Sequence, residues 1–415
     1  MPWTGLYSPD ELKNGVMVSP EEAAARPAAI EPAGTFHRDG STWLIYLIWA
    51  ALGFAVNGLG SVLLPLKEQL GLTTVQTSLY SAFFAIGLVL TGLVGHRLVE
   101  RVGRRRLLMI VLALVGAGAL VMTLGTVVTT FVGAAGIGFG AALMIQVLPV
   151  ELVGLQPAHA PRALSEANSL SSIAGIIAPF GVAWALSAGL GWAFGYSIPL
   201  AVAAGLSMIG LFVARQRAAA QDNPTVPDAP TAAAPVESPW RPWIEMVGSV
   251  AVEFCFVLWS ATAVASWHRV DTSLATLIAG CFLVGMGVGR FVGAPLAGRF
   301  GVRNTTIGCL LLALVGSLAF WFAGNHWIAA GALLIGGLGV SLLYPLTLSR
   351  LLAADPLDTD RATSRSALAS GVAILSVPPL LAGLADLIGL HLAFLVAPGI
   401  LVALIGRNLW PRAKR

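Results

Sequence analysis

Two ionisable residues lie deep inside long apolar stretches of the sequence. Glu253 stands in GSVAVEFCFVLW, and Arg290 stands in GMGVGRFVG. A charge within a membrane-length apolar segment is costly and indicates a functional site. A carboxylate paired with a guanidinium keeps its charge, whereas loss of the pair favours the protonated form. We therefore predict a site at which a proton on Glu253 competes with Arg290 or with a solute group. A static ion pair, or an Arg290 that binds an anionic solute directly, is the alternative that the sequence leaves open.

Three uncharged polar residues lie within other apolar stretches: Asn57, Gln146 and Tyr344. Polar side chains at such places either bind a solute in a cavity or form hydrogen bonds between neighbouring helices. We predict that they line a cavity together with the ionisable pair, and helix bridging is the other interpretation.

A second pair of opposite charges stands at the start of two apolar stretches. Glu166 begins EANSLSSIAGIIAP, and Arg365 occupies the corresponding place in SRSALASG of the second half. Equivalent positions with opposite charge predict a gate that closes across the cytoplasmic entrance. A glutamate that simply stabilises a helix N-terminus explains Glu166 equally well.

The composition decides which elements position these residues. The chain has 415 residues, of which 57% are hydrophobic and 11% are charged. Soluble domains carry about 25% charged residues, so the composition excludes a soluble protein. The three cysteines lie in apolar stretches without CxxC spacing, which excludes a disulfide framework. The sequence therefore predicts an all-α integral membrane protein.

Twelve apolar stretches are long enough to cross a bilayer, which requires about 20 residues each. The stretches cover residues 43–64, 75–96, 107–127, 130–151, 165–187, 193–213, 244–266, 273–296, 305–323, 327–349, 366–386 and 390–408. The predicted domains are a largely disordered tail (1–42), an N-terminal six-helix bundle (43–214), a linker (215–242), a C-terminal six-helix bundle (243–409) and a short tail (410–415).

The distribution of basic residues predicts the orientation. The loops on one side of the membrane hold only Lys67 and Arg269, whereas the opposite loops and both tails hold the other Lys and Arg residues, apart from Arg290 inside a span. Basic loops stay in the cytoplasm, so both tails are predicted to be cytoplasmic. The strong preference for Arg over Lys favours a bacterial protein in the cytoplasmic membrane.

An internal repeat relates the two halves of the chain. A shift of 198 residues overlays Gly95, Leu98, Arg101, Gly103 and Arg105 on Gly293, Leu296, Arg299, Gly301 and Arg303. Six spans in each half give both halves the same orientation, which is a parallel repeat. This architecture places a solute site between two helical bundles that rock about it.

The segment GHRLVERVGRRR, residues 95–106, resembles the signature loop between the second and third helices of the major facilitator superfamily. The matching residues are Leu98, Arg101, Gly103, Arg104 and Arg105, and Glu100 takes the place of an aspartate. The resemblance implies that Glu100, Arg101, Gly103, Arg104 and Arg105 form a gating network that stabilises one conformational state. A simpler interpretation is that these basic residues form a cytoplasmic loop that only fixes the orientation of the neighbouring helices.

These features predict a secondary active transporter that moves a small organic solute by alternating access, with proton coupling. A facilitative uniporter, a drug or metabolite exporter and a receptor-like protein without transport remain alternatives. The sequence contains no HExxH, GxSxG or phosphate-binding loop, so we expect neither enzyme activity nor a cofactor or metal. The expected partners are the solute, protons and the lipid bilayer, with no nucleic acid, and we expect a monomer.

Overall fold

The computed structural model describes residues 36–156, 159–218, 240–354 and 359–409, and side chains are not described at several positions within them. The chain divides into two units, Met1–Arg38 and Asp39–Arg415. The first lies almost wholly outside the described residues, as do the centre of the linker predicted for 215–242 and the tail predicted for 410–415. The second unit contains all the helices named below.

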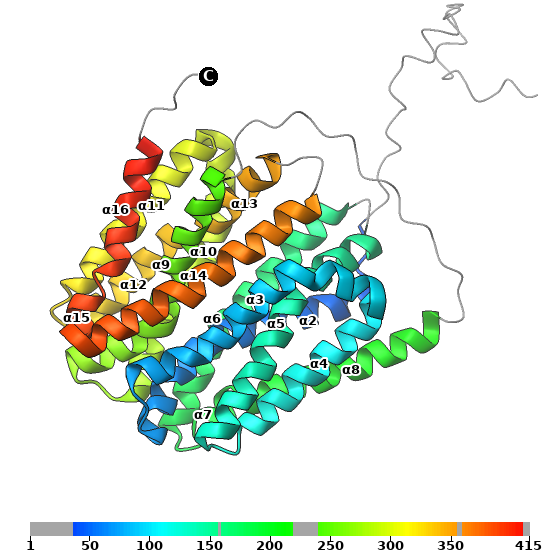
Figure 1. The fold of residues 1–415 in the computed structure, drawn as a ribbon, viewed down its shortest axis with the longest axis horizontal. Helices are drawn as coiled ribbons and strands as arrows, with labels where there is room; N and C mark the ends of the chain where they lie inside the picture. The colour runs from blue at the N-terminus through cyan, green and yellow to red at the C-terminus, as the bar shows by residue number, and fades with distance from the viewer. Residues whose placement is uncertain (1–35, 157–158, 219–239, 355–358, 410–415) are drawn as a thin grey trace, which may run out of the picture. The chain divides into compact units, whose positions relative to one another are not determined.

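The described residues contain twelve segments that are long and apolar enough to cross a membrane. The N-terminal half, residues 39–218, contains α2 (Gly40–Leu70), α3 (Thr74–Val102), α4 (Arg104–Met122), α5 (Val127–Leu155), α6 (Ala160–Ser187), α7 (Trp192–Gly195) and α8 (Ser197–Ala218). The C-terminal half, residues 240–409, contains α9 (Trp240–His268), α10 (Thr272–Phe300), α11 (Val302–Trp321), α12 (His326–Val340), α13 (Leu343–Ala354), α14 (Thr359–Ile388), α15 (Leu390–Ala393) and α16 (Val396–Leu409). The twelve predicted stretches are confirmed as helices (Figure 1).

Local hydrogen bonds explain why the helices begin and end at residues other than the ends of the apolar stretches. The first helix begins at Gly40, three residues before the predicted stretch, because the Asp39 carboxylate accepts a hydrogen bond from the Thr42 amide at 2.8 Å. This N-cap satisfies a backbone donor that would otherwise lack a partner. The same helix continues through Pro65 and ends at Gly71, which adopts a left-handed conformation.

The internal repeat is visible in the backbone itself. Three pairs of residues that lie 198 positions apart share a positive φ angle. The pairs are Gly71 (63°) with Arg269 (53°), Gly103 (81°) with Gly301 (78°), and Gly191 (80°) with Gly389 (86°). Each pair ends or begins corresponding helices in the two halves, so equivalent turns connect equivalent spans.

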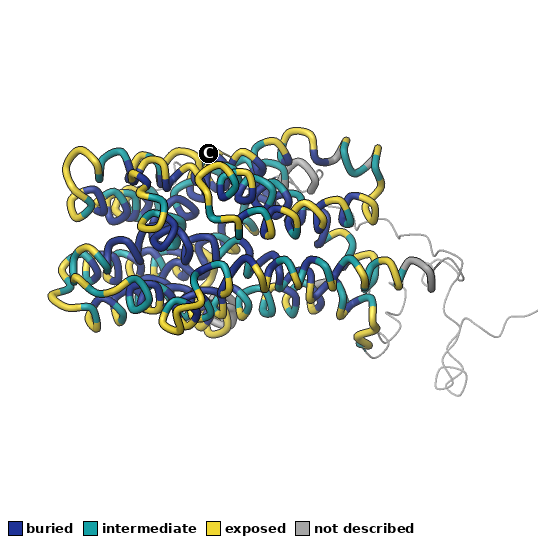
Figure 2. The backbone as a smooth tube through the Cα atoms, turned by 90° about the horizontal axis from the view of Figure 1, so that it is seen from below, coloured by how far each residue is buried: buried dark blue, intermediate teal, exposed yellow. Residues whose placement is uncertain are grey.

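Helices of the two halves pack against each other along three seams. The seams join α3 to α14, α6 to α10 and α2 to α9, and Figure 1 shows α14 running beside α3. Buried residues lie where helices face one another, and exposed residues lie along the outer faces (Figure 2). The centre of the molecule is therefore the interface between the two halves.

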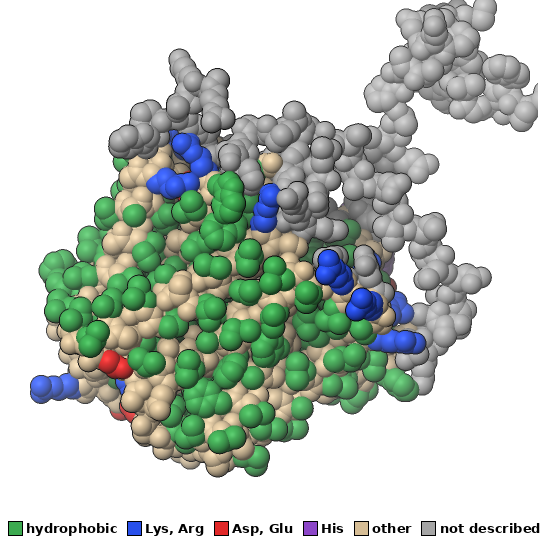
Figure 3. Space-filling view, viewed as in Figure 1, with side chains coloured by type: hydrophobic (Ala, Val, Ile, Leu, Met, Phe, Trp, Pro, Cys, Tyr) green, Lys and Arg blue, Asp and Glu red, His purple; other side chains and the backbone are tan. Residues whose placement is uncertain are grey.

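The outer faces of the helices are apolar, as contact with lipid requires. Exposed large hydrophobic side chains include Leu47, Ile110, Leu206 and Phe291, each at least half exposed. Figure 3 shows hydrophobic side chains across the face in view, with Lys and Arg at its margins. The structure thus has the surface of a multi-pass membrane protein.

We expect Gly103→Ala to lower stability by about 1–3 kcal/mol, because Gly103 has φ 81° and ψ 140°, a region that other residues occupy only under strain. Thermal unfolding of the detergent-purified protein measures the change. Gly308→Ala is the control, because Gly308 lies within α11 with open space where its side chain would be, and alanine favours a helix. Equal melting of the two variants would contradict the conformational explanation.

Candidate functional site

Glu253, Arg290 and Tyr344 come together from three different helices of the C-terminal half. They lie on α9, α10 and α13. Arg290 interacts electrostatically with Glu253, and both charges act on the Tyr344 hydroxyl. Among the described side chains, no ion pair within 4.0 Å joins Glu253 to Arg290. The two charges therefore act on each other without a direct ion pair.

Arg290 links the two halves at this place. Its Nη1 donates a hydrogen bond to Ser172 Oγ on α6 at 2.9 Å. Ser172 belongs to the polar strip that follows Glu166 in the sequence. Because Arg290 is exposed, acts electrostatically on Glu253 and donates a hydrogen bond to the other half, its guanidinium faces the space between the halves rather than the core of one half.

Tyr344 lies beside a break in its membrane span. The span His326–Leu351 consists of α12, which ends at Val340, and α13, which begins at Leu343. Pro345 has no amide hydrogen to donate to the carbonyl of Ser341, four residues earlier, so the helix cannot pass through this point unchanged. The Tyr344 hydroxyl and Ser366 Oγ of α14 lie 3.0 Å apart. Broken helices of this kind form solute sites in transporters with repeated halves.

Asn57 and Gln146 lie within the N-terminal half and are already hydrogen-bonded there. Asn57 Nδ2 donates to the Gly53 carbonyl of its own helix at 3.0 Å. Gln146 Nε2 donates to the Thr91 carbonyl at 3.1 Å and so joins α5 to α3. Glu253, Arg290 and Tyr344 interact electrostatically, whereas the side-chain nitrogens of Asn57 and Gln146 are hydrogen-bonded within the N-terminal half.

Glu166 and Arg365 have separate partners in this state. Glu166 accepts a hydrogen bond from the Tyr46 hydroxyl at 3.1 Å and pairs with Arg162 at 3.2 Å. The main-chain carbonyl of Arg365 accepts a hydrogen bond from Trp243 Nε1 at 3.1 Å. No ion pair between the two residues occurs among the described side chains. Their pairing stays a prediction for a state in which this end of the molecule is closed.

The loop that resembles the family signature is only partly described. Gly103 forms the turn between α3 and α4, and Arg105 Nε lies 3.6 Å from Glu151 Oε1 on α5. The Arg101 and Arg104 side chains are exposed. The Glu100 side chain lies outside the described residues, so the predicted Glu100–Arg104 interaction stays a prediction.

Sequence reasoning missed a buried carboxylate. Glu245 is 4% exposed and forms ion pairs with Arg350 of α13 and, at 3.8 Å, with Arg407 of α16. A buried carboxylate requires such partners. A signal was present, because Glu245 lies just inside an apolar stretch, but its partners are more than 100 residues away in the chain.

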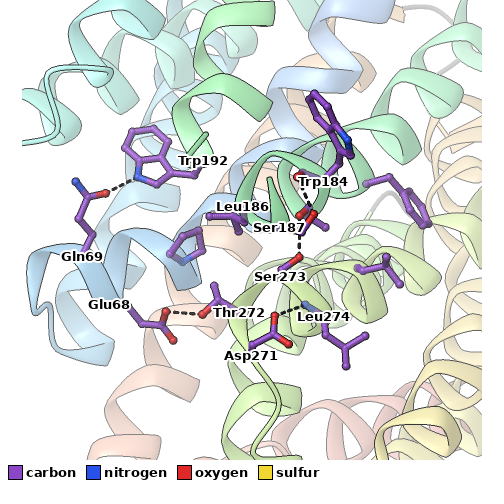
Figure 4. A pocket seen from close by; sticks show the side chains of 15 residues that line it. Glu68, Gln69, Trp184, Leu186, Ser187, Trp192, Asp271, Thr272, Ser273 and Leu274 are labelled. Atoms are coloured by element: carbon purple, nitrogen blue, oxygen red, sulfur yellow. Dashed lines mark hydrogen bonds between the residues drawn. The ribbon is translucent and has the colours of Figure 1, made fainter. Parts of the chain in front are cut away.

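The second missed feature joins the two halves at the end predicted to face outward. Glu68 Oε2 on α2 accepts a hydrogen bond from Thr272 Oγ1 on α10 at 2.5 Å (Figure 4). Ser273 Oγ donates to the Ala183 carbonyl of α6 at 2.7 Å. We call these two hydrogen bonds the latch. A side chain on Gly60 of α2 would collide with the Val257 carbonyl of α9, so the two halves are closed on this side of Glu253.

The described residues contain no group of three or more His, Cys, Asp and Glu side chains that could hold a metal ion. The chemistry available at the candidate site is that of a carboxyl group, a guanidinium and several hydroxyls. These groups bind protons, anions and polar solutes.

Comparison with known proteins agrees with this architecture. The human solute carrier family 2, facilitated glucose transporter member 12, is 28% identical over 161 residues, which is 38% of this chain and 26% of that protein. The mouse protein of the same name is 27% identical over 161 residues. The chain thus matches about a quarter of the length of these curated relatives.

Solved structures resemble the whole fold. The fucose:proton symporter of Escherichia coli has a TM-score of 0.60 at 18% identity, with 90% of this chain and 98% of that chain covered. A peptide transporter in complex with sulfate has a TM-score of 0.66 at 16% identity, with 94% and 99% covered. A bacterial homologue of the human lysosomal transporter Spinster, inward-facing and unoccupied, has a TM-score of 0.62 at 13% identity, with 91% and 100% covered. At these identities the likeness concerns the fold.

The family match extends over almost all of the described chain. Residues 40–268 and 263–414 each match the Major Facilitator Superfamily, in agreement with the repeat, the twelve spans and the paired turns. The chain therefore belongs to the major facilitator superfamily.

Proposed function

We propose that the protein is a proton-coupled secondary transporter of a small polar solute, with Glu253 as the proton site and Arg290 and Tyr344 as solute-binding groups. The observation that carries the proposal is the meeting of these three side chains at the broken span, with Arg290 also bonded to the other half. A charge at this depth needs a partner, and in this state Glu253 has its guanidinium near but not in contact.

The arrangement supports a simple exchange of partners. A proton on the Glu253 carboxyl removes its negative charge, so Arg290 becomes free to bind an electron-rich group of the solute. Loss of the proton restores the attraction between the two residues and weakens the hold on the solute. The Tyr344 and Ser366 hydroxyls add hydrogen bonds that suit a polar solute.

The latch supports alternating access. In the proposed orientation, with both termini in the cytoplasm of a bacterium, the latch closes the outer side of the molecule. The state described is then one in which solute does not exchange with the outer side.

The names of the similar proteins favour a polar solute, but they do not decide whether transport is coupled to protons. One similar structure is named as a fucose:proton symporter, and the human relative is named as a facilitated glucose transporter. The second candidate function is therefore facilitative transport without protons. We propose a monomer as the working unit, since one chain supplies both halves of the site.

The first test measures coupling in liposomes. We expect the wild-type protein to accumulate a sugar, carboxylate or dipeptide when a proton gradient is imposed. Glu253→Gln should abolish accumulation against a gradient but retain exchange of the solute, because the amide cannot exchange a proton. Glu151→Gln, which removes a carboxylate paired with Arg105 and remote from the site, is the matched control and should remain coupled. Accumulation by Glu253→Gln at the wild-type level would place the proton site elsewhere, whereas no accumulation by the wild-type protein would leave facilitative transport.

The second test measures solute binding. Ligands raise the melting temperature of the state that they bind, and we expect Arg290→Ala to remove the shift caused by the transported solute. For an anionic solute, Arg290→Lys should weaken binding by about tenfold, because a lysine lacks the two-pronged geometry of a guanidinium. Ser172→Ala keeps Arg290 and removes only its partner, so it should retain most of the shift. An unchanged shift in Arg290→Ala would exclude Arg290 from the solute site.

The third test concerns the latch. Thr272→Val keeps the shape of the side chain and removes the hydroxyl that binds Glu68. Because a hydrogen bond to a charged group contributes about 1.5–3 kcal/mol, we expect the population with an open outer side to rise by about tenfold. Distances between spin labels on α2 and α10 measure this population. Thr272→Ser retains the hydroxyl and should behave as wild type, and equal distances in all three proteins would show that the latch does not set the equilibrium.

A further inference from the structure

A pocket of about 960 Å³ lies beside the latch, between α2, α6, α7 and α10 (Figure 4). Its volume falls in the range of sites for drug-sized molecules. Glu253, Arg290 and Tyr344 do not line it, so it is separate from the proposed solute site. Because α10 belongs to the C-terminal half and the other three helices to the N-terminal half, the pocket has this form only while the latch is closed.

The pocket wall is largely apolar and includes aromatic rings. Phe180, Trp184 and Leu277 line it and are exposed large hydrophobic residues at the surface of the helices. Trp192 is 5% exposed, and its Nε1 donates a hydrogen bond to Gln69 Oε1 at 2.6 Å, which fixes the ring in place. An amphiphilic molecule dissolved in the adjacent leaflet therefore reaches the pocket sideways, through the apolar rim.

The charge in the pocket is negative. Glu68 and Asp271 line it, and no Lys, Arg or His is among its lining residues. Glu68 uses Oε2 for the latch, and Asp271 uses Oδ1 to accept the Leu274 amide at 3.0 Å. The second oxygen of each carboxylate has no hydrogen-bond partner among the described residues. The neighbouring Lys67 does not line the pocket; its Nζ donates to Thr74 Oγ1 at 3.0 Å, and its charge interacts with Asp386 and Glu68, so it offsets part of the charge of Glu68 and leaves Asp271 as the main negative group.

Aromatic faces together with carboxylates match one class of ligand. Tryptophan rings attract organic cations, and the attraction grows where water is excluded. The apolar wall suits the hydrophobic body of such a molecule, and the two carboxylates suit its charge. A neutral lipid tail would leave the carboxylates unmatched, and an organic anion would be repelled by them.

We propose that this pocket is a second binding site, for a hydrophobic organic cation. The site recognises the outer-closed state because both halves form its walls. A cation bound here stabilises the outer-closed state to the extent that it binds this state more tightly than the open state. It therefore slows the opening of the outer side. This last consequence rests on the proposed alternating access, whereas binding itself does not.

The test is equilibrium binding of tetraphenylphosphonium to the full-length protein in lipid nanodiscs. We expect saturable binding of this cation and none of tetraphenylborate, an anion of the same size and shape. Asp271→Asn keeps the N-cap of α10, since asparagine caps as well as aspartate, and removes the charge. It should weaken binding by about fivefold, as expected for a charge pair in a partly exposed site.

Two further variants separate this pocket from other sites. Ser187→Trp places an indole in the pocket without a change of charge and should weaken binding by obstructing part of the space. Glu253→Gln should bind as wild type. Loss of binding in Glu253→Gln, with Asp271→Asn unaffected, would place the cation at the proposed solute site and overturn the proposal.

A lipid could also occupy the pocket through its ammonium headgroup. Nanodiscs of phosphatidylglycerol and of phosphatidylcholine distinguish the two occupants. Equal affinity in both supports an organic cation as the ligand. Binding that occurs in phosphatidylglycerol and vanishes in phosphatidylcholine would show that a choline headgroup already fills the pocket, and would overturn the assignment. Failure of solute transport in liposomes would leave the binding result unaffected, so the two proposals can fail separately.

Discussion

Glu253 and Arg290 cannot lie in hydrocarbon without a large loss of free energy, and the arrangement of the two halves reflects this constraint. The carboxyl and the guanidinium need polar neighbours at the depth of the bilayer centre. Ser172 of the N-terminal half accepts a hydrogen bond from the guanidinium, and Tyr344 lies within electrostatic reach of both charges. A site built in this way has to lie between the halves, because only there do side chains from both halves meet away from lipid.

Close helix packing occurs within each half and between the halves, and the contacts between the halves add side-chain hydrogen bonds. Within the halves, glycines bring helix backbones together. A side chain on Gly118 would lie 2.7 Å from the Gly133 carbonyl, and one on Gly316 would collide with the Gly336 amide. Such close packing holds membrane helices together without hydrophobic driving force. At the outward end, the side-chain hydroxyls of the latch join the halves in addition to the close approach of Gly60 to the Val257 carbonyl. Each half can therefore move as a rigid body while the bonds between halves exchange with water.

The sequence predicted much of this architecture but only part of the site. The length of the apolar stretches and the repeated turn around Gly103 and Gly301 depend only on local sequence. The twelve spans and the family resemblance could therefore be predicted. The sequence marked Asn57 as a polar residue in an apolar stretch, but it did not reveal the partner of its side chain. That partner is the residue four positions earlier, and the hydrogen bond depends on which face of the helix Asn57 occupies. The partners of Glu245 and Glu68 come from distant helices, and only the packed structure reveals them. Glu166 pairs with Arg162, four residues earlier in the same helix, and its pairing with Arg365 in the other half stays a prediction.

The latch and the pocket beside it depend on the same movement. Glu68 and Thr272 face each other only when α2 and α10 approach, and this approach also brings the wall of α6 against Asp271. A ligand with equal affinity for the open and closed states would shift nothing, however tightly it bound. A pocket whose walls separate on opening cannot have equal affinity, because separation removes either the aromatic faces or the carboxylate of Asp271. The geometry that closes the outer side thus also creates a place from which a bound molecule can hold it closed.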